Sequence, residues 1–336
     1  MAFCSFCRTI LHMKAIVVTS CDGPASLQLR DVPVPTPGAH EILVQVEAVG
    51  INFADVLGAL GRYPAGPTPP YIMGREFAGV TEDGRRVMGY AQHSACAEYV
   101  AVPEGFYWTQ PEGWSSAQCA AFPVNYLTAW LLYWKAGLLK ESIEPAPARE
   151  KLRPRVLIHA AAGGVGTAAV QLGHILGFEL FGTASSAEKL AKLAPLGLTH
   201  GIDYKEDDYE IRIGKLTGGQ GVDAVFDCLA GEHTFKSLAC LAEFGRIILF
   251  GNATGETARF NTSAMYSKSL SAHGLWLAKL SANHALIRQA LDSMNPYILD
   301  GQLHPTIGAK FPMAAAADAH RLLLERKNFG KVVLTL

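Results

Sequence analysis

Residues 155–166, RVLIHAAAGGVG, combine the residue types that hold the pyrophosphate of a dinucleotide. The strand-forming residues Val156–Ile158 lead into a turn of small residues, and a helix-favouring segment, TAAVQLGHILG, follows. Gly163 and Gly166 have the spacing of the second and third glycines of GxGxxG, with Ala161 in the first position. This order of strand, turn and helix places a phosphate at a helix N-terminus, so it predicts a dinucleotide site. The alternative is a structural turn that binds no ligand.

The stretch 179–190, ELFGTASSAEKL, indicates which dinucleotide would bind. A site for NAD usually has an acidic residue about 20 residues past the glycines, where it binds the ribose 2′-hydroxyl. Here Ser185, Ser186 and Lys189 follow the expected strand, and no acid stands at its tip. Hydroxyl and ammonium groups suit a 2′-phosphate, which a carboxylate would repel. We therefore predict NADPH over NADH. The two serines also suit the cap of the next helix, and the two roles are compatible.

The first third of the chain is rich in short strand patterns that proline and glycine interrupt. The expected strands are Lys14–Val18, Glu41–Val49 and Glu98–Val102. Residues 61–70, GRYPAGPTPP, contain too much proline for a helix or a central strand. We expect them to form a surface loop near whatever the protein binds.

From about residue 120 the pattern changes to alternating helices and strands. Residues 120–134 predict one long apolar helix, and 141–154 a polar loop that contains proline. The strands expected after that loop are Arg155–His159, Glu179–Thr183, His200–Asp203, Ala224–Asp227, Arg246–Gly251 and Ser271–Leu275. This alternation predicts an α/β fold with a parallel sheet and helices on both faces. The last segment, Gly330–Leu336, has a strand pattern that could return to the first domain.

The chain resembles the zinc-independent quinone oxidoreductases (zeta-crystallin-like) of the medium-chain dehydrogenase/reductase superfamily, from Met13 to Leu336. The motifs that carry the resemblance are VGINFADV at 49–56, GREFAG at 74–79, AAFPVNYLTAW at 120–130, HAAAGGVG at 159–166 and FGNATG at 250–255. The resemblance implies a GroES-like, β-rich substrate domain (13–128 and 284–336) and a Rossmann domain with a doubly wound parallel sheet (129–283). The active site would lie in the cleft between them, and residues 1–12 would be an N-terminal extension.

The same resemblance implies which residues contact the cofactor. Those implied at the nicotinamide end are Asn52, Thr128 and Asn328, those at the pyrophosphate are Gly163, Gly164, Val165 and Gly166, those around the 2′-phosphate are Ser185, Ser186, Lys189 and Tyr204, and those lining the cofactor cleft are Phe250 and Asn252. It also implies a homodimer formed through the edge strand near 271–275.

The metal ligands of zinc-dependent members of the superfamily are replaced in this chain. Where those members carry a cysteine and a histidine, this sequence has Asn52 and Arg75. Nothing between Gly79 and Val102 resembles the four spaced cysteines of a structural zinc lobe, and the eleven histidines are scattered. We therefore predict that the protein binds no metal. Without a Lewis acid, oxidation of an alcohol is disfavoured, whereas an electron-poor acceptor can still be reduced.

Tyr63 is the best candidate for a proton donor or a hydrogen-bond partner of the substrate oxygen, because it lies in the proline-rich loop. The alternative is that its ring only packs under that loop. Asn52 could donate an amide N–H to the ribose or the substrate. Asp55 shares a helical face with it, as a catalytic group or a structural cap. Three aromatic residues could supply an apolar wall or simply belong to the core: Phe53, Tyr126 and Trp130.

The overall composition excludes several classes of function. The formal net charge is -1 and the chain has no long basic stretch, so nucleic-acid binding and electrostatic membrane attachment have no support. No apolar run approaches the ~20 residues of a membrane span. The seven cysteines have no regular spacing, and the pair Cys4 and Cys7 precedes the expected first strand. We interpret that pair as part of the extension, and the protein as cytoplasmic.

Three functions remain open from the sequence. The first is an NADPH-dependent reductase of quinones. The second is an NADPH-dependent enoyl or enone reductase, which would have the same fold. A thioester carrier would favour a basic patch, but Arg62, Arg75, Arg85 and Arg86 are too scattered to indicate one. The third is an NADPH-binding protein without turnover.

Overall fold

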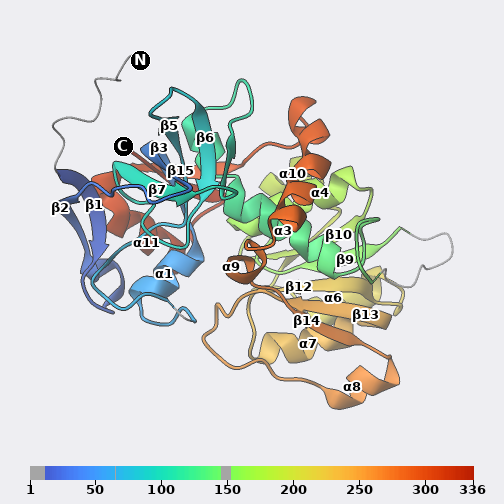
Figure 1. Ribbon diagram of the computed structural model, residues 1–336. Coiled ribbons are helices and arrows are strands. Elements are labelled where there is room, and N and C mark those ends of the chain that lie inside the picture. The colour runs from blue at the N-terminus through green and yellow to red at the C-terminus, as the bar shows by residue number, and fades with distance from the viewer. Residues whose placement is uncertain (1–11, 65, 145–152) are drawn as a thin grey trace. The chain divides into compact units, whose positions relative to one another are not determined.

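The computed structural model describes residues 12–64, 66–144 and 153–336. Contacts within the chain define two compact units, which Figure 1 shows: unit 1 is Met1–Asn125 with His304–Leu336, and unit 2 is Tyr126–Leu303. The predicted division placed the return to the first domain at residue 284, whereas the chain returns at 304. The difference is the helix α10 (His284–Leu299), which belongs to unit 2. The amphipathic pattern of α10 predicts that one face of the helix is buried, but it does not indicate which of the two units covers that face.

The predicted N-terminal extension, residues 1–12, lies outside the described residues except for His12. That residue is the first of strand β1, so it belongs to the fold. The pair Cys4 and Cys7 also lies outside the described residues. The five cysteines that the structure describes form no disulfide bond with one another.

Unit 1 contains two sheets. The smaller has the order β2-β1-β4, with β1 (His12–Val18), β2 (Leu27–Pro33) and β4 (Tyr71–Ile72). The larger has the order β15-β16-β3-β5-β6-β8, and β7 also pairs with β3. Its strands are β3 (Glu41–Ile51), β5 (Glu76–Thr81), β6 (Arg86–Tyr90), β7 (Tyr99–Pro103), β8 (Tyr107–Thr109), β15 (Ile307–Pro312) and β16 (Lys331–Thr335). The helices are α1 (Phe53–Ala59), α2 (Ser116–Ala120) and α11 (Ala316–Leu324). This β-rich unit has the GroES-like fold.

The C-terminal strand returns to unit 1, as its pattern indicated. β16 pairs with β3 in antiparallel register, with Val332 opposite Ile51 and Val333 opposite Gly50. Lys331 directly precedes Val332 in β16, and Asn52 directly follows Ile51 at the end of β3. The last strand of the protein therefore carries a lysine to the start of α1, almost three hundred positions away in the sequence.

The segment predicted as one helix over 120–134 is two helices. α2 ends at Ala120, and α3 (Pro123–Lys135) begins three residues later. Pro123 explains the break, because proline has no N–H to donate to the preceding turn and favours the first position of a helix. Ser115 marks the start of α2, where its hydroxyl accepts the N–H of Gln118.

Unit 2 contains a parallel sheet of six strands in the order β11-β10-β9-β12-β13-β14. Its strands are β9 (Arg155–Ile158), β10 (Glu179–Ala184), β11 (His200–Asp203), β12 (Val222–Asp227), β13 (Leu241–Leu249) and β14 (Ser271–Gly274). Its helices are most of α3, then α4 (Gly164–Ile175), α5 (Ala187–Leu193), α6 (Tyr209–Leu216), α7 (Glu232–Cys240), α8 (Thr262–Ser267), α9 (Leu277–Leu280) and α10. This is the predicted Rossmann-type sheet.

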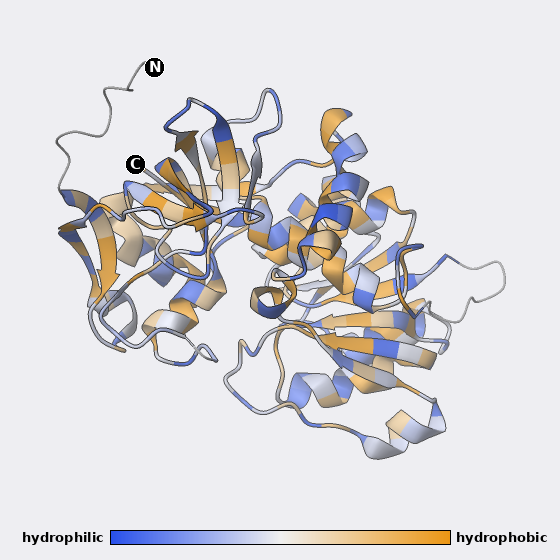
Figure 2. Ribbon diagram, viewed as in Figure 1, coloured by the Kyte–Doolittle hydropathy of each residue, from blue (hydrophilic) through white to orange (hydrophobic). Residues whose placement is uncertain are grey.

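The strand order of unit 2 determines where a ligand can bind. The chain runs outward from β9 to β11, then returns to the other side of β9 with β12. Right-handed crossovers therefore put helices on both faces, and the strand order reverses between β9 and β12. Ligands of such sheets bind outside the carboxyl ends of the strands at this point. The strands themselves are largely hydrophobic (Figure 2), and Leu157, Phe181 and Val225 are fully buried.

In the part of the chain that the structure describes, no helix is both long enough and apolar enough to cross a membrane.

Candidate functional site

The glycine turn of unit 2 joins the end of β9 to the N-terminus of α4. Gly163 is the N-cap of this helix and provides no side-chain cap, so the first N–H groups of the helix have no capping side chain. A Cβ on Gly166 would lie 2.4 Å from the carbonyl oxygen of Ala160. Only glycine therefore lets α4 approach the turn this closely. The structure brings Gly163, Gly164, Val165 and Gly166 together in a form that fits a pyrophosphate group.

A buried histidine lies directly before this turn, and the sequence analysis did not single it out. His159 is 1% exposed. Its Nδ1 lies 3.1 Å from the Thr183 hydroxyl on β10, and its Nε2 lies 2.8 Å from the Ser237 hydroxyl on α7. Burial lowers the pKa of His159 to about 4, so the ring is neutral at neutral pH. The ring links three elements at the start of the turn. The position of His159 directly after a strand, and directly before the glycine turn, was the signal in the sequence that could have identified it.

The end of β10 carries the residues predicted to bind a 2′-phosphate. Ser186 caps α5 by accepting the Lys189 N–H at 3.3 Å, so the capping role is observed. Tyr204 follows β11, the neighbour of β10, and its N–H donates to the Ala184 carbonyl at 3.1 Å. Ser185 and Ser186 follow β10, Lys189 lies in the first turn of α5, and Tyr204 follows β11. All four are half-buried.

The charge at this strand end favours an anion. Burial lowers the pKa of Lys189, and the neighbouring Lys205 ammonium lowers it further. Two ammonium groups close enough to interact are relieved by a bound dianion. Asp203 ends β11, but its Oδ1 accepts the backbone N–H of Lys205 at 3.1 Å. The Asp203 carboxylate therefore stabilises the turn that follows β11.

The ends of β12 and β13 complete this edge of the sheet. The fully buried Asp227 accepts the backbone N–H of Leu229 at 2.8 Å and the hydroxyl of Thr234 at 2.6 Å. It therefore shapes the turn after β12. The N–H of Phe250 donates to the Asp227 carbonyl at 3.0 Å, which places Phe250 beside β12. Phe250 is half-buried and Asn252 is exposed, both just past the carboxyl end of β13.

In unit 1, Asn52 and Asp55 lie at the N-terminus of α1. Asn52 is the N-cap, and Asp55 Oδ2 accepts its backbone N–H at 2.8 Å. Asp55 thus has the capping role that the sequence analysis gave as one of its two alternatives. Burial raises the pKa of Asp55, and the Arg75 guanidinium acts in the opposite direction.

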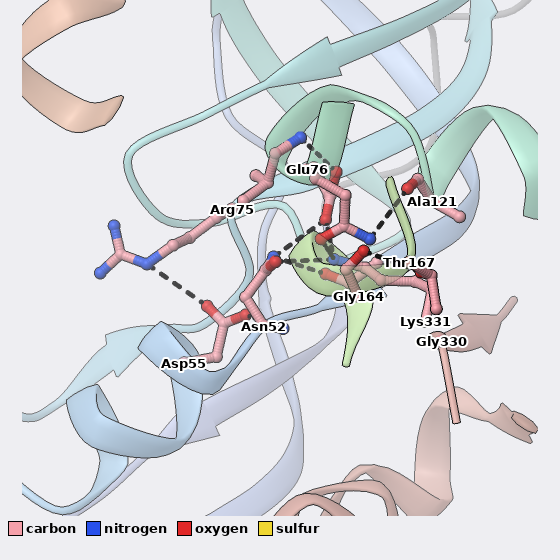
Figure 3. A network of polar contacts seen from close by, with 12 residues as sticks. Asn52, Asp55, Arg75, Glu76, Ala121, Gly164, Thr167, Gly330 and Lys331 are labelled. Carbon is pink, nitrogen blue, oxygen red and sulfur yellow. Dashed lines mark hydrogen bonds and ion pairs between the residues drawn. The ribbon is translucent and has the colours of Figure 1, made fainter. Parts of the chain in front are cut away.

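The Asn52 side chain belongs to a buried network, which Figure 3 shows. Its Nδ2 donates to Glu76 Oε1 at 2.9 Å, and its Oδ1 accepts from Lys331 Nζ at 2.6 Å. Lys331 and Glu76 form an ion pair in which the side chains are 2% and 0% exposed. The other oxygen of Glu76 accepts the N–H of Val124 at 2.8 Å. Both ends of the Asn52 amide are therefore bound within unit 1.

Glu76 and Lys331 were not recognised from the sequence, although Glu76 lies in a motif quoted for the family resemblance and Lys331 in the C-terminal strand pattern. A Cβ on Gly50 would lie 2.6 Å from Glu76 Oε1 and 2.2 Å from the Ala120 carbonyl. Glycine at position 50 of VGINFADV therefore makes room for Glu76. A glycine within a buried strand pattern was a signal of such a close approach.

Arg75 joins Tyr63 to Asp55. Its guanidinium carbon lies 4.2 Å from the centre of the Tyr63 ring. Its Nη1 donates to the Gln92 carbonyl at 2.8 Å, and its Nε lies 3.5 Å from Asp55 Oδ1. The structure therefore brings the three predicted catalytic residues, Asn52, Asp55 and Tyr63, into one cluster with Arg75. Among the described residues, no group of three or more His, Cys, Asp or Glu side chains could hold a metal ion.

The remaining predicted residues have separate positions. Thr128 lies in α3 and is 6% exposed. Asn328 precedes β16, where its Nδ2 donates to the Gly330 carbonyl at 3.2 Å. Tyr126 and Trp130 are 1% and 2% exposed, so of the two alternatives they belong to the core. Phe53 is half-buried and packs against the core of unit 1.

Two protein families match this chain. The family described as "Alcohol dehydrogenase GroES-like domain" matches residues 38–112, and the family described as "Zinc-binding dehydrogenase" matches residues 164–295. The first match lies in unit 1 and the second in unit 2.

Similar proteins cover almost the whole chain. The "Quinone oxidoreductase-like protein 2 homolog" of Nematostella vectensis is 32% identical over 88% of this chain and 82% of its own length. The "Synaptic vesicle membrane protein VAT-1 homolog" of Rattus norvegicus is 32% identical over 96% of this chain and 84% of its own length. Among solved structures, the quinone oxidoreductase of Thermus thermophilus, also solved with NADPH, is 38% identical with a TM-score of 0.84. That match covers 96% of this chain and 100% of the other.

Proposed function

Because this chain belongs to the quinone oxidoreductase family of the medium-chain dehydrogenase/reductase superfamily, we propose that it reduces a quinone or a similar electron-poor carbonyl compound with NADPH, without a metal ion. The observation that carries the proposal is the pairing of two features. One is the glycine turn after β9, together with Lys189 in α5, the helix that follows the neighbouring strand β10. The other is Arg75, a buried cation at the position that the family resemblance assigns to a zinc ligand.

The residues of unit 2 fit NADPH. The backbone N–H groups at the start of α4 would hold the pyrophosphate, since glycine at position 166 lets this helix approach the turn closely. Ser185, Ser186, Lys189 and Tyr204 would bind the 2′-phosphate, and Phe250 and Asn252 would border the cofactor. Thr128 and Asn328 would contact the nicotinamide end. When bound, NADPH supplies a hydride, which carries two electrons. Solved relatives with NADPH support this choice of cofactor.

The residues of unit 1 would bind and orient the acceptor. Tyr63 would donate a hydrogen bond from its phenol to the acceptor oxygen, with its ring held against Arg75. Asp55 and Asn52 would keep Arg75 and the start of α1 in place through the capping interaction and the Glu76–Lys331 pair. In this proposal the protein contributes orientation, electrostatics and exclusion of water.

The arginines considered for a thioester carrier do not support an exposed basic patch. Arg75 is buried, Arg85 pairs with Asp83, and Arg86 pairs with Glu47. Reduction of a CoA thioester therefore has less support than reduction of a quinone.

We also propose that the protein is a homodimer in the cytoplasm. β14 is an edge strand of the six-stranded sheet, so its outer edge has backbone groups that a second copy could pair with. The lack of disulfide bonds among the described cysteines is consistent with a reducing compartment. Light scattering coupled to gel filtration would test the dimer, and a monomer at micromolar concentration would contradict it.

The function is tested by following NADPH oxidation with 1,4-benzoquinone, 9,10-phenanthrenequinone, crotonyl-CoA and simple enones. We expect turnover with the quinones, before and after treatment with a chelator. Turnover with crotonyl-CoA or the enones alone would assign the protein as an enoyl or enone reductase. NADPH binding without turnover of any acceptor would indicate a binding protein, and activity lost to the chelator and restored by zinc would contradict the metal-free proposal.

A further inference from the structure

Arg75 has an unusual environment for a charged side chain. Its side chain is 9% exposed, and the side chain of Asp55, its ion-pair partner, is 3% exposed. Removing a guanidinium from water is costly unless its charge and its N–H groups are compensated. A buried arginine whose charge and N–H groups are only partly matched by protein groups is therefore a candidate for binding a ligand.

The compensation of Arg75 is incomplete. A guanidinium carries five N–H donors in one plane. One nitrogen donates to the Gln92 carbonyl at 2.8 Å, and the Tyr90 hydroxyl also interacts with the group. Nε is buried and has no hydrogen-bond partner among the described residues, because Asp55 Oδ1 lies 3.5 Å away. The other oxygen of Asp55 is already bound to the Asn52 N–H. Arg75 therefore has donor capacity that the described residues do not use.

The aromatic neighbours of Arg75 hold the group without neutralising it. The Arg75 guanidinium carbon lies over the Tyr63 ring, 4.2 Å from its centre, which is within the distance of a cation–π interaction. Burial raises the pKa values of Tyr71 and Tyr90 to about 12, so both phenols are neutral at neutral pH. Arg75 is thus a largely buried cation that lies over an aromatic ring and has a single acidic partner in the described part of the chain.

We propose that Arg75 binds the carbonyl oxygen of the acceptor and stabilises the negative charge that this oxygen gains on reduction. This inference rests on the proposed function. In a quinone, one hydride from NADPH adds two electrons and one proton, which leaves NADP⁺ and a hydroquinone monoanion. A proton from Tyr63 or from water then gives the neutral hydroquinone. Arg75 acts on the monoanion, as a fixed charge that the protein has already oriented.

Arginine suits this role better than lysine. Its planar fork can give two parallel hydrogen bonds to one oxygen acceptor group, and it remains charged at any pH at which the protein folds. The substrate class that follows is a planar carbonyl compound whose reduced form carries a delocalised oxyanion. Quinones and enones both belong to it, whereas simple alcohols do not.

The test measures binding of an oxyanion without turnover. 4-Nitrophenolate and 4-nitroanisole share a ring and a nitro group, but only the first is charged. Their dissociation constants are measured by absorbance titration with the full-length protein, with and without NADP⁺, at a pH at which 4-nitrophenol is ionised. The variants are Arg75→Met, Arg75→Lys and, as a matched control, Arg62→Met, which removes an exposed charge from the loop that carries Tyr63.

We expect the wild-type protein and Arg62→Met to bind the phenolate about tenfold more tightly than the anisole, the effect of one charge-assisted hydrogen bond. Arg75→Met should lose this preference and Arg75→Lys should keep part of it. An equal preference in folded Arg75→Met, or none in the wild type, would overturn the proposal. If Arg75→Met does not fold, Arg75→Lys is compared with Arg62→Met instead. A full preference for the phenolate in both variants would overturn the proposal. If no acceptor is reduced but the phenolate preference depends on Arg75, the proposed function fails, and only the binding of an oxyanion by Arg75 stands.

Discussion

Lys331 and Glu76 are separated by 255 positions in the sequence and form a buried ion pair in unit 1. The pair joins the first residue of the C-terminal strand β16 to the first residue of β5 (Figure 3). Asn52 bridges it with one hydrogen bond to each partner. The position of the Asn52 side chain, and with it the start of α1, therefore depends on the last strand of the protein.

Removing Lys331 alone should destabilise the protein strongly. Lys331→Met leaves the fully buried Glu76 without its cation, so we expect a loss of about 3 to 5 kcal/mol in the free energy of unfolding. The double variant with Glu76→Gln should lose less, because neither charge is then unpaired. The exposed pair Lys14–Asp31 is the control, and Lys14→Met should cost less than about 1 kcal/mol. Urea unfolding measures all three. Similar losses for Lys331→Met and Lys14→Met would contradict the assignment.

Gly166→Ala should weaken NADPH binding. The added Cβ would lie 2.4 Å from the Ala160 carbonyl, so α4 must move away from the turn. We expect the dissociation constant, measured by NADPH fluorescence, to rise at least about tenfold. Gly214 lies in α6 with no atom within 4 Å of its would-be Cβ, so Gly214→Ala is the matched control. It should leave binding unchanged and stabilise the helix by up to about 1 kcal/mol. Unchanged binding in Gly166→Ala would show that the turn does not hold the cofactor.

Lys189→Met should reduce the preference for NADPH over NADH. The Lys205 ammonium lowers the pKa of Lys189 by repulsion, and a 2′-phosphate would relieve that repulsion. We expect the ratio of the two dissociation constants, from fluorescence titration or from the shift in Tm, to fall about tenfold or more. Lys192, in the same helix, pairs with Glu188 and is exposed, so Lys192→Met should leave the ratio unchanged. Wild-type protein with equal affinity for both nucleotides would refute the cofactor assignment.

Stability should decrease as the pH falls, in part because of His320. This residue is fully buried in α11, and neither ring nitrogen has a hydrogen-bond partner among the described residues. Burial lowers the pKa of His320 from 6.5 to about 4. Between these values the unfolded chain binds a proton that the folded protein does not, so stability is lost as the pH falls from about 6.5 to 4. The full loss from this residue is about 3 kcal/mol.

The contribution of His320 to the pH dependence of stability can be isolated by substitution. His320→Leu replaces the imidazole with an apolar side chain of similar size and so removes the titrating group. Urea unfolding at several pH values should show a flatter profile for this variant below about pH 6.5. An identical pH profile for the variant and the wild type would mean that His320 does not titrate as its burial indicates.

Tyr63→Phe should lower turnover and leave NADPH affinity nearly unchanged. The substitution removes the phenol but keeps the ring that lies 4.2 Å from Arg75, so the packing of the guanidinium is retained. We expect kcat with 1,4-benzoquinone to fall about a hundredfold or more, the usual contribution of a positioned proton donor. Wild-type turnover in this variant would leave Tyr63 with the packing role alone.

The parts of the site that depend on neighbouring residues could be predicted from the sequence. The glycine turn, the serine cap of α5 and the Asn52–Asp55 cap each involve residues within a few positions of one another, so local spacing indicates them. The alternation of strands and helices in the second half likewise indicated a parallel sheet, because each crossover is a local unit. Where a local rule was overlooked, the prediction was wrong: Pro123 divides the expected helix over 120–134.

Only the tertiary structure decided which distant residues meet. Glu76 and Lys331 contact Asn52 because β16 pairs with β3 in one register, and no local pattern carries that information. The stacking of Tyr63 on Arg75 and the placement of α10 in unit 2 have the same origin. The physical reason is that hydrophobic and charge patterns specify which face of an element is buried, whereas its partner is selected by packing across the whole chain.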